Sequence, residues 1–142
     1  MRLCSIASGS SGNCIYVGSE ATHLLVDVGI SGKKAEAGLN SLGLTGRDLD
    51  GILVTHEHMD HVAGLGVMAR KYDVPIYATP GTLEEIQKMG NLGKIDPELF
   101  REVKEDVKLT IKDLTVNPMK ISHDAAQPVG YRIAYGNKSV RI

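Results

Sequence analysis

The chain of 142 residues is short of several residue types, and each shortage excludes a class of protein. It has no Trp, one Phe and five Tyr, so few rings are available for stacking on nucleic-acid bases. Its two cysteines, Cys4 and Cys14, do not form a Cys-x-x-Cys pair. We therefore expect a reduced, cytoplasmic protein rather than a disulfide framework.

Charge and hydropathy exclude two further classes. Lys and Arg number 16 and Asp and Glu 17, so overall charge is no reason to expect a nucleic-acid partner. No apolar run approaches the roughly 20 residues of a membrane-spanning helix, and the N-terminus lacks the pattern of a signal peptide. We expect no membrane partner and one domain, residues 1–142, because 42% hydrophobic and 23% charged residues are typical of a globular chain.

The spacing of apolar residues predicts strands that alternate with helices. Strands are expected at 3–7, 14–17, 22–28, 50–55, 75–78, 107–116, 131–135 and 139–142, and helices at 31–42, 60–72 and 82–89. Ser31 and Thr82 are the expected caps of the first and third helices, and residues 90–100 are expected to be a loop. This order of elements predicts a mixed α/β or α+β fold.

The strongest chemical signal is His56-x-His58-x-Asp60-His61, directly after a predicted buried strand. His56 and His58 point the same way from an extended segment and can bind one ion. Asp60 and His61 lie where a helix begins and project towards a neighbouring position. Imidazole and carboxylate ligands suit zinc or manganese, so we expect one or two divalent ions. A closed structural zinc site would more often use thiolates.

Three other features are candidates for the same site. His123 follows an apolar strand and is the expected third ligand of the first ion, which leaves an open position for water. Asp27, at a strand end, orients an imidazole or simply caps a turn. The segment 8–13 is a phosphate-binding loop or a flexible connector, its candidate residues being Ser8, Ser10, Ser11 and Asn13. His23, in the middle of a strand, is expected to be structural.

These residues resemble the metallo-β-lactamase superfamily. The resemblance is carried by the His/Asp motif after its strand, by Asp27 and by His123. Segments 8–14, 55–58 and 121–131 are similar to the YycJ/WalJ-like branch of 5′-to-3′ exonucleases. The likeness implies an αββα sandwich that holds its metal site at one edge of the sheets.

The resemblance also implies a mechanism. His56, His58 and His123 would hold the first ion and Asp60 and His61 the second, with Asp60 also orienting the attacking water. The reaction would be phosphodiester hydrolysis at DNA ends by a metal-bound hydroxide. His58 and Asp60 are the expected catalytic residues. The same motif serves hydrolases of small thioesters, lactones or cyclic phosphodiesters, which are the first alternative.

The chain departs from the family pattern after His123. Members of the family carry a later Asp that bridges both metal ions and a last His that binds the second ion. In this chain the only Asp after His123 is Asp124, and no further His follows. We therefore expect a C-terminally shortened domain, with the second sheet and its covering helix largely missing and the second ion weak or absent. An exposed apolar sheet face would then favour a two-fold dimer, and the second alternative is an inactive metal-binding remnant that assembles with itself.

Overall fold

The computed structural model describes residues 1–142 and contains two β-sheets. The first sheet has six strands in the order of the chain: β1 (Arg2–Ala7), β2 (Cys14–Gly18), β3 (His23–Val26), β4 (Gly51–Leu53), β5 (Ile76–Ala78) and β6 (Phe100–Glu102). Strands β1 to β3 pair antiparallel, whereas β3 to β6 are parallel. The carboxyl ends of β3, β4 and β5 consequently meet at one edge of the sheet, where an open α/β sheet places its ligand site.

The parallel strands are joined through helices on one face of this sheet. They are α1 (Gly32–Ser41), α2 (Met59–Val62), α3 (Leu65–Tyr72) and α4 (Pro80–Lys88), with short 3₁₀ turns at Gly46–Asp48, Gly90–Leu92 and Pro97–Leu99. Ser31 caps α1 as predicted, because its hydroxyl accepts the Lys34 N–H at 3.2 Å. None of the helices combines the length and the hydropathy that crossing a membrane requires.

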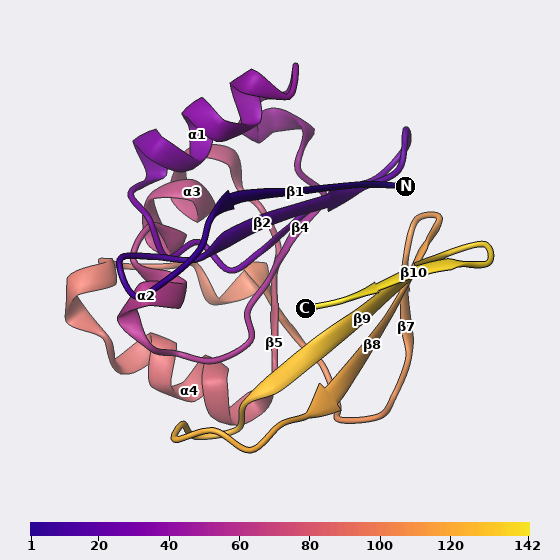
Figure 1. Cartoon of the computed structure of the whole chain (residues 1–142). Coiled ribbons are helices and arrows are strands. Elements are labelled where there is room, and N and C mark those ends of the chain that lie inside the picture. Colours follow the sequence, from indigo (N-terminus) through magenta and orange to yellow (C-terminus); the bar gives the residue numbers. More distant parts are fainter.

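The second sheet covers the other face of the first sheet (Figure 1). Its four antiparallel strands are β7 (Leu109–Ile111), β8 (Leu114–Lys120), β9 (Val129–Tyr135) and β10 (Lys138–Arg141). Eleven buried residues form the core between the sheets, and 19 form the core between the first sheet and the helices. The buried Tyr131 links the two sheets directly, because its hydroxyl donates to the Val54 carbonyl at 2.8 Å.

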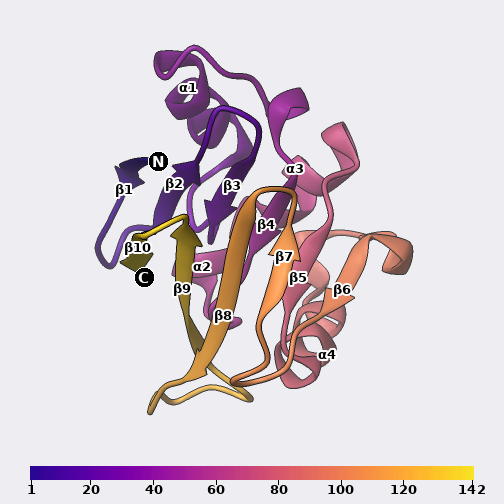
Figure 2. The ribbon, with the colours of Figure 1, turned by 90° about the vertical axis from the view of Figure 1, so that its right-hand side faces the viewer.

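The expectation that one sheet exposes an apolar face is wrong. Residues 107–142 build four strands that cover the first sheet, so the layer of helices and both sheet layers are present in this shortened αββα fold (Figure 2). The outer face of the second sheet carries mainly polar side chains, among them Thr110, Thr115, Asn117, Arg132, Ser139 and Arg141. This removes the physical reason for which a dimer was expected.

The predicted helix over 60–72 is broken into α2 and α3. The break lies at Gly64, whose N–H donates to the Val28 carbonyl at 2.9 Å rather than within a continuous helix. A Cβ at this glycine would lie 2.2 Å from the Ile30 carbonyl oxygen. The segment after β3 therefore packs against the break. The spacing of apolar residues within 60–72 cannot show this contact, because the contact is made with a distant part of the chain.

Three further boundaries differ from the prediction. The strand predicted over 107–116 is two paired strands, β7 and the start of β8. Helix α4 begins at Pro80, with Thr79 as its N-terminal flanking residue, so Thr82 lies inside the helix and is not its cap. The buried Thr82 hydroxyl is 3.0 Å from the Thr79 hydroxyl and 3.3 Å from the Gln127 carbonyl, a long-range contact. The predicted loop 90–100 ends in the first residue of β6, a three-residue strand too short to show alternation.

We expect Gly29→Ala to lower the free energy of unfolding by about 3 kcal/mol, the upper end of the cost of overpacking. A Cβ at residue 29 would lie 1.7 Å from the backbone carbonyl oxygen of Asp60 and 2.7 Å from the backbone nitrogen of Asn13, and these backbone atoms cannot rotate away. Gly90→Ala is the matched control, because a Cβ at Gly90 meets nothing within 4 Å. Urea unfolding of both variants measures the difference; equal midpoints would contradict the packing argument.

Candidate metal centre

Four of the five histidines converge at the carboxyl edge of the first sheet. His56 follows β4 by three residues, His58 immediately precedes α2, and His61 lies within α2. His123 comes from the segment between β8 and β9 of the second sheet. The ring centroid of His56 lies 4.8 Å from that of His58, 4.0 Å from that of His61 and 4.3 Å from that of His123. The two sheets therefore bring together residues 62 or more positions apart in the chain.

His56, His58 and His123 form a group able to bind a metal ion. Each offers a ring nitrogen, and the three nitrogens lie within 4.8 Å of one another. His56 is buried, His58 is partly buried and His123 is exposed, so the group has an inner wall and an open side. Three imidazoles and an open side match the ligand sets of catalytic zinc sites, which leave one position for water. The residues thus fit the metal that the motif predicts.

Asp27 orients the imidazole of His61 directly and that of His56 through Thr55. Its Oδ1 accepts the Thr55 N–H at 2.8 Å, and its Oδ2 accepts the Thr55 hydroxyl at 2.8 Å and the His61 Nδ1–H at 2.7 Å. Because the Thr55 hydroxyl gives its one hydrogen to Asp27, it accepts the Nδ1–H of His56 at 2.9 Å. In its neutral form each ring therefore carries its hydrogen on Nδ1 and presents the Nε2 lone pair to the site.

The backbone of Asp27 is part of this arrangement. Its φ is +64°, a left-handed conformation that few residues other than Gly adopt and that Asp tolerates better than most. The Asp27 N–H donates to the Leu53 carbonyl at 2.8 Å, which continues the β3–β4 ladder by one bond. The carboxylate is buried, so its position is set by the ends of two adjacent strands.

Electrostatics keep the inner histidine neutral. Burial first, and then the charges of His61, His123 and His58, lower the pKa of His56 from 6.5 to about 4. Its ring is therefore unprotonated at neutral pH and can accept a cation without losing a proton. Burial also lowers the pKa of His61, but the hydrogen bond and the negative charge of Asp27 outweigh it, so that the pKa of His61 is raised.

Asp60 and His61 lie side by side next to the three-histidine group. The Asp60 Oδ2 is 3.6 Å from the His61 Nε2, and the Asp60 side chain is about one third exposed. The backbone carbonyl of Asp60 accepts the Asn13 N–H at 2.8 Å, and the Val28 N–H donates to the His61 carbonyl at 2.9 Å. Helix α2 is thus fastened to both the segment 8–13 and the end of β3.

The segment 8–13 reaches this second position through Asn13 alone. The side-chain nitrogen of Asn13, Nδ2, is 3.3 Å from the His61 Nε2 and 3.4 Å from the Asp60 Oδ2. Ser8, Ser10 and Ser11 are exposed and form no hydrogen bond within the chain. A phosphate-binding role for this segment stays a prediction. His23, by contrast, lies at the opposite end of β3, where the Tyr16 hydroxyl is 2.6 Å from its Nδ1.

Glu57 is a site residue that the sequence reasoning missed. Its Oε2 accepts the Ala126 N–H at 3.0 Å, so it ties the motif to the segment that carries His123. Its Oε1 is buried and forms no hydrogen bond. The only signal in the sequence is its place between His56 and His58, and Glu is also common on solvated surfaces.

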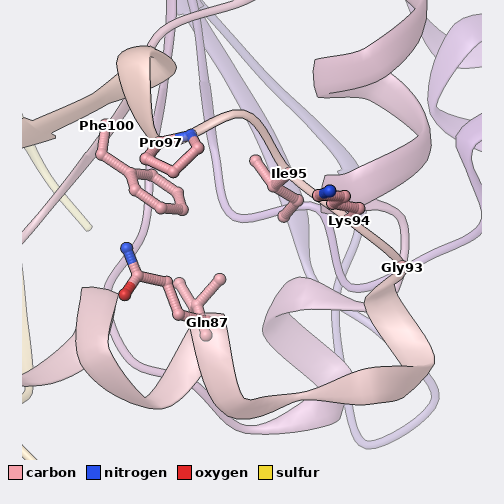
Figure 3. A pocket seen from close by; sticks show the side chains of 7 residues that line it. Gln87, Gly93, Lys94, Ile95, Pro97 and Phe100 are labelled. Atoms are coloured by element: carbon pink, nitrogen blue, oxygen red, sulfur yellow. The ribbon is translucent and has the colours of Figure 1, made fainter.

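A cavity of about 370 Å³ opens beside the histidines. Its walls include Asp27, Thr55, His56, His61 and His123, together with apolar residues of both sheets. A second cavity, of about 270 Å³, lies between α4 and the segment 93–100 and is lined by residues such as Gln87, Ile95 and Phe100 (Figure 3). None of the predicted site residues lines the second cavity, so the chemistry of the motif belongs to the first.

Sequence comparison identifies long relatives of this chain. The family model described as "Metallo-beta-lactamase superfamily" matches residues 7–140. The chain is 44% identical over 138 residues to exodeoxyribonuclease YycJ of Bacillus anthracis, and 40% identical over 134 residues to exodeoxyribonuclease WalJ of Streptococcus pneumoniae. These matches cover 96% and 94% of the chain but 51% and 50% of the relatives, so the chain spans about half the length of the curated relatives it matches.

Solved structures show the same fold. The Rm3 metallo-β-lactamase is similar with a TM-score of 0.78 at 19% identity, covering 98% of this chain and 56% of that one. A B3 metallo-β-lactamase with an active-site glutamic acid has a TM-score of 0.80 at 18% identity, covering 99% and 57%. The family match, the relatives and the fold agree, and the chain belongs to the metallo-β-lactamase superfamily.

Proposed function

We propose that this chain carries the principal metal-binding half of a metal-dependent phosphodiester hydrolase that acts on DNA ends. The observation that carries the proposal is the group of His56, His58 and His123, which offers three nitrogens around an open position. The two relatives at 40% and 44% identity are named exodeoxyribonucleases, which favours a nucleic-acid substrate over a small ester or lactone. Fold likeness alone would not separate these substrates.

The residues divide into those that hold an ion and those that act on water. His56, His58 and His123 would hold the first ion. A divalent ion at this position would lower the pKa of a bound water molecule and neutralise charge on a phosphate. Thr55 and Asp27 direct the hydrogen of the neutral His56 and His61 rings to Nδ1, which leaves each Nε2 free to bind an ion. Asp60, partly exposed beside this group, is placed to accept a hydrogen from a water molecule and so to orient it for attack.

Metal content is the first test. We expect about one transition-metal ion per chain in protein purified without chelator, with zinc or manganese as the ion, and loss of that ion in His58→Ala. His23→Ala is the matched control, because His23 lies at the far end of β3. Elemental analysis of the three proteins gives the answer. Metal that survives His58→Ala, or that is lost equally in His23→Ala, would contradict the assigned ligands.

The hydroxyl that links Asp27 to His56 gives a second prediction. Thr55→Val keeps the shape of the side chain but removes that hydroxyl, so we expect the metal affinity of the three-histidine group to fall about 10-fold. Thr55→Ser retains the hydroxyl and should retain most of the affinity. Competition with a chromogenic zinc chelator measures both variants. Full affinity in Thr55→Val with loss confined to Thr55→Ser would show that packing of the methyl group, not the hydroxyl, matters.

Activity is the third test. We expect metal-loaded protein to release nucleotides from the 5′ ends of DNA, slowly because Asp60 and His61 alone hold a second ion weakly, and Asp60→Asn to lower that rate at least about 100-fold. Labelled DNA, RNA, a thioester and a cyclic dinucleotide should be assayed together. Preference for the thioester would favour a small-molecule hydrolase. Bound metal with no hydrolysis of any of them would favour the metal-binding remnant.

A further inference from the structure

Two hydrogen-bond acceptors face each other at the edge of the metal centre. The His61 Nδ1–H donates to Asp27 at 2.7 Å, so the Nε2 of the neutral ring carries a lone pair. The Asp60 Oδ2, also an acceptor, lies 3.6 Å from that Nε2. Two acceptors this close repel each other unless a donor hydrogen or a cation lies between them.

The side chain of Asn13 supplies the donor. Its Nδ2 is 3.3 Å from the His61 Nε2 and 3.4 Å from the Asp60 Oδ2. Gly9 determines which end of the amide faces the site, because the Gly9 N–H donates to the Asn13 Oδ1 at 3.1 Å. The Gly9 carbonyl in turn accepts from the Asn13 Nδ2 at 3.0 Å. A flipped amide would lose both bonds.

One hydrogen cannot satisfy all the acceptors that remain. Of the two hydrogens on the Asn13 Nδ2, one is used by Gly9, and the other faces three acceptors: the Asp60 carbonyl at 3.2 Å, the Asp60 Oδ2 and the His61 Nε2. The two longest of these contacts are those to the side chains of Asp60 and His61. A divalent cation bound between these two side chains would satisfy both atoms and would displace the amide hydrogen.

We propose that Asn13 is a positioning residue that takes the place of the second cation. Its amide holds Asp60 and His61 in register while that position lacks a metal, and it gives up its contacts with the Asp60 Oδ2 and the His61 Nε2 when a second ion binds. This inference rests on the proposed metal-dependent function. Asn13 forms no hydrogen bond with His56, His58 or His123, so the first ion binds without disturbing it.

Asn13→Asp tests the exchange directly. The substitution puts a carboxylate oxygen where the amide donor stands, so the metal-free site loses its donor and the second ion gains a ligand. We expect the dissociation constant of the second zinc ion to fall at least about 10-fold, with the first unchanged. Asn40→Asp, which adds the same charge on the exposed side of α1, is the control and should change neither. Zinc titration by calorimetry measures both ions.

A spectroscopic readout in the unsubstituted protein guards against misfolding of the variant. The side-chain amide resonances of Asn13 should stay in place while the first equivalent of zinc binds and should shift with the second. An amide that shifts with the first equivalent, or that never shifts as zinc is added beyond the first equivalent, overturns the inference. A second-ion affinity that Asn13→Asp leaves unchanged overturns it as well. Failure of the proposed function is a different result: no zinc binds to the three histidines at all.

Discussion

The site depends on one buried carboxylate. Asp27 accepts hydrogen bonds from the Thr55 N–H, the Thr55 hydroxyl and the His61 Nδ1–H, so it joins the end of β3 to the end of β4 and to α2. A carboxylate in a low-dielectric interior is costly unless its lone pairs are used, and here three donors use them. The same three bonds determine which nitrogen of His56 and of His61 is free. The stability of the sheet edge and the orientation of the candidate metal ligands therefore come from one interaction.

The second sheet completes the site from the other side. His123 belongs to the segment between β8 and β9, and that segment is held against the motif by Glu57, whose carboxylate accepts the Ala126 N–H. Tyr131 strengthens the same contact between sheets through its bond to the Val54 carbonyl. The three-histidine group is thus assembled across the sheet interface, whereas Asp60, His61 and Asn13 form a position that belongs to the first sheet and α2.

The pattern of the sequence predicted what depends on neighbours along the chain. The cap of α1 at Ser31, the first three strands and the candidate ligands of the motif were visible as local spacing. The helix break at Gly64 was not, because the carbonyls that exclude a continuous helix belong to the segment after β3. Nor was the role of Thr82, whose buried hydroxyl meets Gln127. The expected apolar face was wrong for the same reason: alternation showed that strands follow residue 107, but not that they fold back over the first sheet.

The sequence by itself determined the candidate chemistry of this protein and its fold class: four histidines and an aspartate of metal-binding type, and a mixed fold. These follow from residue identity and from spacing within a strand or a turn. Only the tertiary structure decided how Asp27 is used, since turn capping and imidazole orientation look alike in sequence. It also decided that Asn13 reaches the side chains of Asp60 and His61 and that Glu57 holds the His123 segment. Each of these is a contact between segments far apart in the chain, whose geometry exists only once both sheets and α2 have packed together.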